Sequence, residues 1–244
     1  MSPTGNPPRI GITCPDDHPV FSVVGERLRE RGHRVTNYDP NASIAPDELE
    51  RLALFVTKQT RPASVRALLA AERLGVPTWN SATGVVACVS RFSQLCLLSG
   101  VGFAVPTASR TRPDGDYVAK ALYHWDMSPE VNGEGDVYEE LLSADPVDYK
   151  YYVVHDGSTY RTVVLRVTSK LWGQKRVLGA VDPVPDHADR ITSLMDRLDM
   201  RAIGVDLIRT DDRWYAVDLN PCPSFVRTGL EGALVDSIES ALPE

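Results

Sequence analysis

The chain has 244 residues, enough for one large domain or two small ones, which excludes a mini-protein held together by disulfides. Hydrophobic residues make up 43% and charged residues 24%, as in ordinary globular proteins, which excludes disordered, collagenous and membrane-embedded classes. The 26 basic and 33 acidic residues give a net charge of -7, which argues against general nucleic-acid affinity, so any basic site must be local.

The first third of the chain alternates between strand and helix patterns. Short apolar runs predict strands at residues 10–14, 33–38, 52–58 and 76–79. Apolar residues at helical spacing predict helices at 20–32 and 62–74, which end at Gly32 and Gly75. Strands separated by helices of this length predict a parallel sheet with crossover helices, so we expect a small N-terminal α/β domain.

Beyond Pro106 the pattern changes to strands and turns with few helices. The predicted strands are 117–122, 137–142, 149–155, 159–167, 202–209 and 213–219, and the predicted helices are 187–198 and 230–242. This order predicts a mostly antiparallel sheet, so the second part is α+β. The loop 123–135, rich in Pro, Asn, Gly and Asp, is predicted to lack regular structure, as lids often do.

The sequence carries no pattern of export or membrane insertion. Residues 1–9 are polar and proline-rich, without the apolar core of a secretory signal, and no apolar run approaches the roughly 18–20 residues that cross a bilayer. The cysteines form no C-x-x-C pair, which argues against a zinc cluster; they are Cys14, Cys88, Cys96 and Cys222. We expect a cytoplasmic protein with free thiols, no membrane or nucleic-acid partner, and an oligomeric state that the sequence leaves open.

The most informative chemical pattern lies in the two strands predicted near the C-terminus. Side chains alternate along a strand, so Asp218 and Asn220 share one face while Val217 and Leu219 share the other. A hairpin loop with an odd number of residues would set Asp206 opposite Asp218. Two carboxylates and an amide oxygen suit magnesium, so the pattern indicates either a magnesium site or a solvent-facing polar edge.

A local excess of basic residues lies between positions 157 and 181. This segment has no acidic residue and five basic ones, namely Arg161, Arg166, Lys170, Lys175 and Arg176. Such a segment is either an anion site or a solvated basic surface. Arg161 and Arg166 are five positions apart, so in an unbroken strand they face opposite ways, and Arg166 is expected to face the site.

Lys120 ends the apolar strand pattern Tyr-Val-Ala-Lys. A buried ammonium at this position needs an anionic partner, which is either a phosphate or a neighbouring carboxylate.

The order of these motifs resembles the ATP-grasp superfamily over roughly residues 90–225. The motifs are the strand that ends in Lys120, the segments Tyr138-Glu-Glu-Leu-Leu and Asp148-Tyr-Lys-Tyr-Tyr-Val-Val, and the set Asp206, Asp218 and Asn220. The resemblance implies an N-terminal α/β domain over 1–89 and a two-subdomain ATP-grasp nucleotide-binding fold over 90–244, with 106–142 as its smaller lobe. It also implies that ATP is held between the subdomains and bridged by magnesium ions.

Carried over position by position, the resemblance implies a set of site residues. Lys120 would contact the phosphates, and Asp148 is the candidate for the ribose hydroxyls. The hinge that reads the adenine edge would be formed by Glu139, Glu140, Leu141 and Leu142. The magnesium ligands would be Asp206, Asp218 and Asn220, with Asp218 in place of the more usual glutamate.

Two positions depart from the family pattern. Ser90-Arg91 stands where the family often has Asp-Lys, and Arg91 can hold a phosphate with two parallel hydrogen bonds. The loop after Lys120 lacks a glycine-rich phosphate cradle, and its His124 and Trp125 are either substrate contacts or surface residues.

The resemblance implies transfer of the terminal phosphate of ATP to a carboxylate, giving an acyl phosphate that an amine attacks. Because such catalysis depends on positioning and charge, Arg166 is the candidate catalytic residue. We expect a Mg-ATP-dependent carboxylate-amine ligase similar to the RimK-like branch, acting on a small-molecule or peptide acceptor.

Two other functions remain open. A small-molecule kinase similar to the inositol polyphosphate kinases is indicated by Arg91, by the segment Thr57-Lys-Gln and by Lys150. A nucleotide-binding module without catalysis is the third possibility, and it predicts ATP binding with no turnover.

Overall fold

The computed structural model describes residues 7–123 and 128–243, and the contacts within them divide the chain into two compact units. The first unit comprises residues 1–82, 154–161 and 224–244, and the second comprises 83–153 and 162–223. Both units are discontinuous in sequence because the chain returns to the first unit twice. The predicted domains 1–89 and 90–244, with 106–142 as the smaller lobe, stay a prediction about the nucleotide-binding fold.

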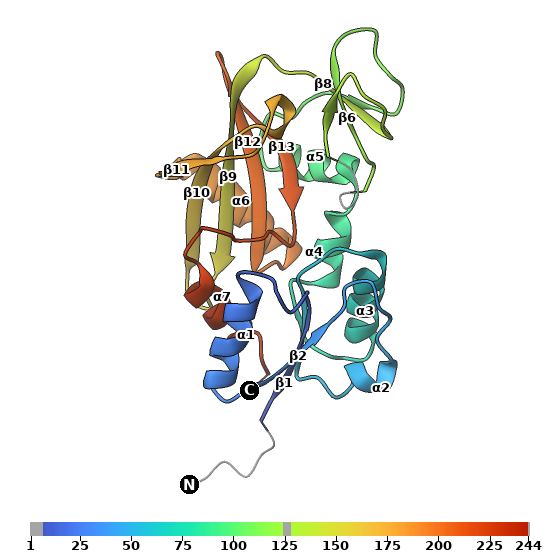
Figure 1. Cartoon of the computed structure of the whole chain (residues 1–244), viewed down its shortest axis with the longest axis vertical. Helices are drawn as coiled ribbons and strands as arrows, with labels where there is room; N and C mark the ends of the chain where they lie inside the picture. The colour runs from blue at the N-terminus through green and yellow to red at the C-terminus, as the bar shows by residue number, and fades with distance from the viewer. Residues whose placement is uncertain (1–6, 124–127, 244) are drawn as a thin grey trace. The chain divides into compact units, whose positions relative to one another are not determined.

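The first unit is built on the predicted parallel sheet, with strand order β2-β1-β3-β4. Its elements are β1 (Arg9–Thr13), α1 (Phe21–Glu30), β2 (Arg34–Tyr38), α2 (Pro46–Leu49), β3 (Leu54–Thr57), α3 (Pro62–Arg73), β4 (Thr78–Trp79) and α7 (Glu231–Glu239). Figure 1 shows α1 and α3 on opposite sides of this sheet. Helix α1 packs against α7, and Trp79 Nε1 donates a hydrogen bond to Ser237 Oγ over 3.0 Å, so the C-terminal helix completes the N-terminal unit.

The second unit holds two antiparallel sheets, apart from residues 154–161, which join β9 to β10 and belong to the first unit. A small sheet has strand order β5-β8-β6-β7, from β5 (Ala108–Ser109), β6 (Tyr117–Lys120), β7 (Glu130–Val131) and β8 (Val137–Glu140). The large sheet has strand order β11-β10-β9-β12-β13, from β9 (Ala144–His155), β10 (Tyr160–Thr168), β11 (Val177–Val181), β12 (Ala202–Thr210) and β13 (Trp214–Asn220). The helical elements are α4 (Ala82–Ala87), α5 (Arg91–Gly100), η1 (Lys170–Trp172) and α6 (Pro185–Leu198).

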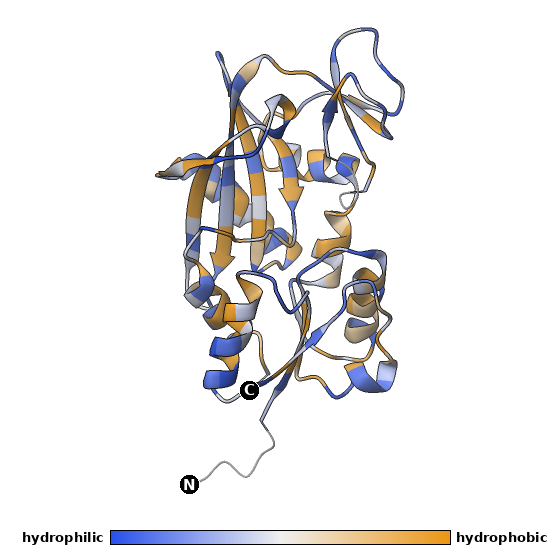
Figure 2. Cartoon of the chain, viewed as in Figure 1, coloured by the Kyte–Doolittle hydropathy of each residue, from blue (hydrophilic) through white to orange (hydrophobic). Residues whose placement is uncertain are grey.

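Because side chains alternate along a strand, one face of the large sheet carries buried apolar residues. Figure 2 shows hydrophobic bands along its strands, and Val205, Leu207, Ala216 and Leu219 are fully buried.

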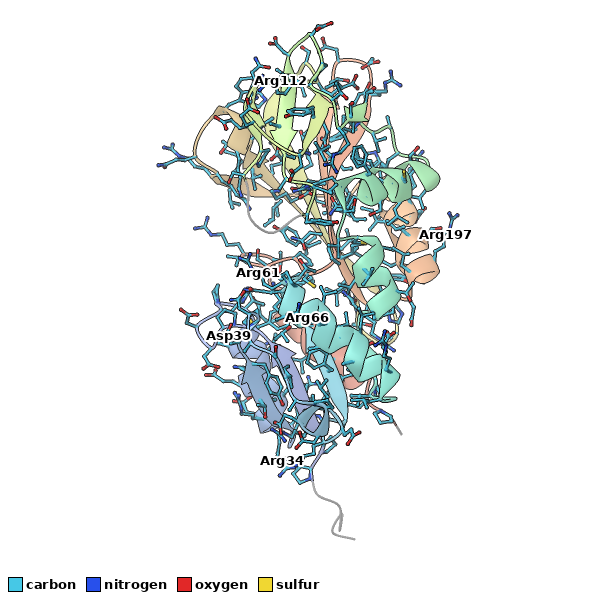
Figure 3. All side chains as sticks on the ribbon, turned by 90° about the vertical axis from the view of Figure 1, so that its right-hand side faces the viewer. Arg34, Asp39, Arg61, Arg66, Arg112 and Arg197 are labelled. Atoms are coloured by element: carbon cyan, nitrogen blue, oxygen red, sulfur yellow. The ribbon has the colours of Figure 1, made fainter. Side chains whose placement is uncertain are left out.

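In the small sheet Arg112, labelled in Figure 3, lies over the rings of Tyr117 and Tyr138, 5.5 and 6.0 Å from their centroids. The mixed α/β and antiparallel architecture confirms the predicted fold class.

The loop predicted to lack structure, 123–135, contains the short strand β7. Val131 pairs with Val118 and Glu130 with Ala119, so this part of the loop lies at the edge of the small sheet. The candidate His124 and Trp125 lie outside the described residues. Gly135 closes the loop against β6, where an added Cβ would lie 2.8 Å from the Lys120 carbonyl oxygen, so this close approach requires glycine.

No helix among the described residues is both long and apolar enough to traverse a lipid bilayer.

Candidate active site

A β-bulge in β13 sets the two predicted metal-binding carboxylates opposite each other. The strands pair Arg209 with Trp214, which leaves a turn of four residues, an even number and not the odd one expected. The register shifts after Leu207 pairs with Ala216, so that Asp206 pairs with Asp218 and Val217 is the extra residue. The predicted pairing is therefore present, but the bulge produces it and the turn does not.

The same bulge connects the hairpin to Lys120. Lys120 Nζ donates to the Val217 carbonyl oxygen over 2.9 Å and to Glu139 Oε2 over 2.6 Å. Lys120 and Glu139 are 7% and 2% exposed, so this is a buried ion pair between β6 and β8. Of the two partners that the sequence left open for Lys120, the structure shows the carboxylate, Glu139.

Asp218 and Asp206 are each paired with a cation. Arg91, at the start of α5, donates from Nη1 to Asp218 Oδ1, and Lys150 of β9 donates from Nζ to Asp206 Oδ2. Burial acts to lower the pKa of Lys150, but the charge and hydrogen bond of Asp206 outweigh it and raise that pKa above its usual value. Both predicted metal ligands are thus neutralised by basic groups in this structure.

A buried glutamine holds Arg91. Gln94 lies one helical turn after Arg91 and is 1% exposed. Its Oε1 accepts from Arg91 Nη1 over 3.2 Å, and its Nε2 donates to the Cys88 carbonyl oxygen over 2.7 Å. The sequence does not single out Gln94, because it predicts no helix over residues 91–100, and that helix is what sets Gln94 beside Arg91.

Asp148 lies near the Lys150 and Asp206 pair. Burial raises the pKa of the Asp148 carboxyl, while Lys150 acts in the opposite direction. Burial also lowers the pKa of Lys175, and the charge of Lys150 lowers it further. Lys175 from the basic segment therefore belongs to the electrostatic environment of these residues.

The predicted hinge follows β8 out of the small sheet. Glu139 Oε2 accepts from Lys120, and Glu139 Oε1 is buried without a hydrogen-bond partner in the described part of the chain. The backbone N–H groups of Glu140 and Leu141 donate to the carbonyl oxygens of Thr107 and Asp116, over 2.9 and 3.3 Å. Leu142 is half-buried and follows directly.

Asn220 and Arg166 differ in their relation to these carboxylates. Asn220 alternates with Leu219, so it shares the face of Asp218, and its Oδ1 accepts from the Cys222 N–H over 2.8 Å. Arg166 is not brought to the ion pairs, because its guanidinium lies over the ring of Tyr149, 5.9 Å from the centroid. Arg161, the arginine expected to face away, pairs with Asp156 over 2.7 Å at a 57% exposed position.

The donor chemistry fits a magnesium ion better than a softer metal. Within residues 7–123 and 128–243, no cluster of three or more His, Cys, Asp or Glu side chains is arranged to hold a metal. Asp206, Asp218 and Asn220 instead offer two carboxylates and an amide, a small set of oxygen donors that suits an ion which keeps several water or phosphate ligands.

The chain has the fold of the ATP-grasp ligases. It is similar to the ATP-grasp ligase PsnB complexed with a minimal precursor, with 18% identity over 96% of this chain and 99% of that chain and a TM-score of 0.69. It is similar to the macrocyclase MdnC of Microcystis aeruginosa bound with precursor peptide MdnA, with 11% identity, 95% and 99% coverage, and a TM-score of 0.66. A RimK domain ATP-grasp protein from Sphaerobacter thermophilus matches with 14% identity, 94% and 99% coverage, and a TM-score of 0.71.

No protein-family model matches the chain, and no curated protein matches its sequence. The likeness to the solved structures confirms the expected ATP-grasp fold, and the chemistry has to be argued from the site.

Proposed function

We propose that the chain is a Mg-ATP-dependent carboxylate-amine ligase. The observation that carries the proposal is the set of three ion pairs that link separate elements of the second unit: Lys120 with Glu139, Arg91 with Asp218, and Lys150 with Asp206. A triphosphate with a bound metal requires cations for its phosphate oxygens and oxygen ligands for the metal. The three cations meet the first requirement, and the two facing carboxylates and the amide meet the second.

In this proposal the ion pairs exchange partners when the nucleotide binds. Lys120 and Arg91 contact phosphate oxygens, and Asp206, Asp218 and Asn220 hold magnesium, which neutralises charge on the phosphates. Because Lys120, Arg91 and Lys150 are each paired with a carboxylate, these three cations have a counter-charge without the nucleotide. Asp148 contacts the ribose, and the segment from Glu139 to Leu142 is the adenine hinge.

The reaction that we propose has two steps. A carboxylate oxygen of the acceptor attacks the terminal phosphorus of ATP, the bond to ADP breaks, and an acyl phosphate forms. An amine then attacks the acyl carbon, inorganic phosphate leaves, the amine loses a proton, and an amide remains. The chain contributes positive charge and orientation, and no Ser, Cys or His nucleophile is needed.

We propose a peptide as the acceptor. The support comes from similar folds: the solved PsnB and MdnC structures contain a precursor peptide, and a ligase from Chryseobacterium gregarium is in complex with ADP and a leader and core peptide. The amine and the carboxylate would then belong to side chains of the same peptide or to a peptide and a small molecule.

A small-molecule kinase is the second candidate. The favouring observation is that Arg91 and Lys150, which resemble that branch in sequence, both pair with the predicted magnesium ligands. Lys58, from the third kinase-like segment, belongs to the first unit.

The test is product analysis after incubation of the protein with Mg-ATP and a peptide that contains both Lys and Glu. A ligase releases ADP and phosphate and lowers the peptide mass by one water. A kinase with a hydroxyl acceptor raises the acceptor mass by one phosphate and releases no free phosphate. ATP binding without turnover for either class of acceptor would contradict both proposals and favour a non-catalytic module.

A further inference from the structure

Arg166 belongs to a row of arginine and aromatic side chains in the large sheet. Its guanidinium lies over Tyr149, whose ring packs edge-on against Trp214 with the centroids 4.7 Å apart. Arg209, paired with Trp214 across β12 and β13, lies 5.8 Å from the Trp214 centroid. Arg166, Tyr149, Arg209 and Trp214 are called the arginine-aromatic row below.

The arginine-aromatic row lies on the sheet face that turns away from the candidate active site. Tyr149 and Lys150 are consecutive in β9, so their side chains point to opposite faces, and Lys150 pairs with Asp206. Trp214 also contacts His187 of α6, with ring centroids 5.2 Å apart. The row is therefore on the α6 side of the sheet, away from the paired carboxylates.

The arginines of the row have hydrogen-bond donors that the described chain does not use. Arg166 Nε is buried and has no acceptor among the described residues, which is rare for a native side chain. In the described part of the chain, Arg166 and Arg209 lack ion pairs, whereas the neighbouring Arg161 and Arg213 pair with Asp156 and Asp212. Since the guanidinium of Arg166 is held by a ring and not by an anion, a carboxylate would approach its Nη groups and not the buried Nε.

The surface beside Arg166 is open. Its partner across β10 and β11 is Gly179, and a Cβ placed at Gly179 would meet no atom of residues 7–123 or 128–243 within 4 Å. Arg209, on β12, is exposed. A ligand that lies across β10, β9, β12 and β13 would thus meet arginine and aromatic side chains in alternation.

We propose that the arginine-aromatic row is a docking site for an acidic segment of a peptide partner. Carboxylates of the segment accept hydrogen bonds from Arg166 and Arg209, and its apolar side chains pack on Tyr149 and Trp214. Guanidinium groups that lie on aromatic rings keep their edges available for a carboxylate, which is why such pairs occur at protein interfaces. A peptide fits better than a free anion because the row offers apolar and charged contacts in alternation. A peptide also fits better than a long polyanion, which the net charge of -7 would repel.

The test uses a fluorescein-labelled peptide, Glu-Glu-Leu-Phe-Glu-Glu, and a control peptide in which every Glu is replaced by Gln. Binding to the full-length protein is measured by fluorescence anisotropy without nucleotide. Arg166→Gln and Arg209→Gln are each expected to weaken binding of the acidic peptide by about tenfold or more, as for other interfacial charge pairs. Arg161→Gln is the matched control, because it removes the same charge from the same strand, and it should change the affinity less than about twofold.

Several outcomes would overturn the docking site. They are equal binding of the two peptides, equal loss of affinity in the Arg161 and Arg166 variants, no binding of the acidic peptide, and equally strong competition by an oligo-dT strand. Thermal unfolding checks that Arg166→Gln folds, and the exposed Arg209→Gln provides a second variant if it does not.

A turnover measurement separates this site from catalysis by Arg166. If Arg166→Gln abolished turnover with peptide at saturation but left peptide affinity unchanged, Arg166 would be catalytic and the docking proposal would fail. Because peptide binding is measured without ATP, failure of the proposed ligase function would not by itself change this result.

Discussion

Arg91 and Asp218 form an ion pair across 127 positions of sequence, between the first turn of α5 and the end of β13. The Arg91 side chain is 8% exposed and that of Asp218 is 25% exposed, so the pair is largely shielded from water. Removing either partner leaves the other charge poorly solvated. The pair therefore connects folding stability to the same groups that the proposed function uses for phosphate and magnesium.

The first prediction concerns Asp218. Asp218→Asn is expected to abolish magnesium-dependent ATP turnover and to reduce the free energy of unfolding by about 1–3 kcal/mol, because Arg91 loses its counter-charge. Turnover and urea unfolding are measured side by side. Asp211→Asn, an exposed change of the same charge in the adjoining turn, is the control and should alter neither. Wild-type turnover in Asp218→Asn at saturating ATP would contradict the assignment.

The second prediction concerns Lys120 and Glu139. Lys120→Met is expected to weaken ATP binding by about 2–5 kcal/mol and to destabilise the fold, since Glu139 remains as a buried, unpaired carboxylate. Adding Glu139→Gln should restore part of the stability but none of the ATP affinity. Calorimetric titration and urea unfolding of the two variants distinguish these effects. ATP affinity unchanged in Lys120→Met would show that the lysine serves the fold alone.

The third prediction concerns Gln94 as a positioning residue. Gln94→Met keeps a similar volume but removes the acceptor for Arg91 and the donor to the Cys88 carbonyl. We expect a loss of stability of about 1–2 kcal/mol and a several-fold rise in the KM for ATP with a smaller change in kcat. Ser93→Ala, which removes a hydrogen bond to Ser90 on the same helix, is the control. An equal effect of both changes on KM would argue for helix stability in place of arginine orientation.

The fourth prediction concerns pH and His18 in the first unit. Burial and the charge of Lys58 lower the pKa of His18 to about 4, and its Nδ1 accepts from the N–H groups of Val20 and Phe21 at the start of α1. Because the unfolded histidine has a pKa of about 6.5, the unfolded state takes up a proton first, and stability falls as the pH drops from 7 toward 4.

His18→Asn should flatten that dependence, because asparagine can still cap the helix and does not titrate. The measurement is the free energy of unfolding of both proteins in urea at several pH values between 4 and 7.5. Identical slopes for the two proteins would show that His18 is not responsible.

The sequence predicts most strands and four of the helices because the hydrophobic periods of two and 3.6 are local properties, but it does not predict α2, α4, α5 or β5. It also predicts the pairing of Asp206 with Asp218, since the alternative register would put Leu219 in water. It cannot predict the bulge at Val217, because a bulge depends on the turn length and on what lies beside the strand. The strands β7 and β11 are missed because one has two residues and the other contains Gly179 in a basic segment.

The ion pairs of the candidate site cannot be predicted from the sequence, because they depend on tertiary contacts. Lys120 requires an anion, but the choice between a phosphate and Glu139 depends on which residue the small sheet places next to it. Likewise, alternation predicts that Arg161 and Arg166 point apart, but it does not tell which face of the sheet carries the site. Tertiary contacts with Tyr149 and Asp156 decide where the two guanidinium groups lie.

The extra residue in β13 has a further consequence for how the hairpin could change. If Val217 were deleted, Ala216 would still pair with Leu207 and the next residue would still pair with Asp206, so the carboxylates would stay opposed without any bulge. The deletion would remove the peptide carbonyl of Val217, to which Lys120 donates. A one-residue deletion thus separates two roles of the hairpin, since it changes the contact with Lys120 and leaves the carboxylates paired.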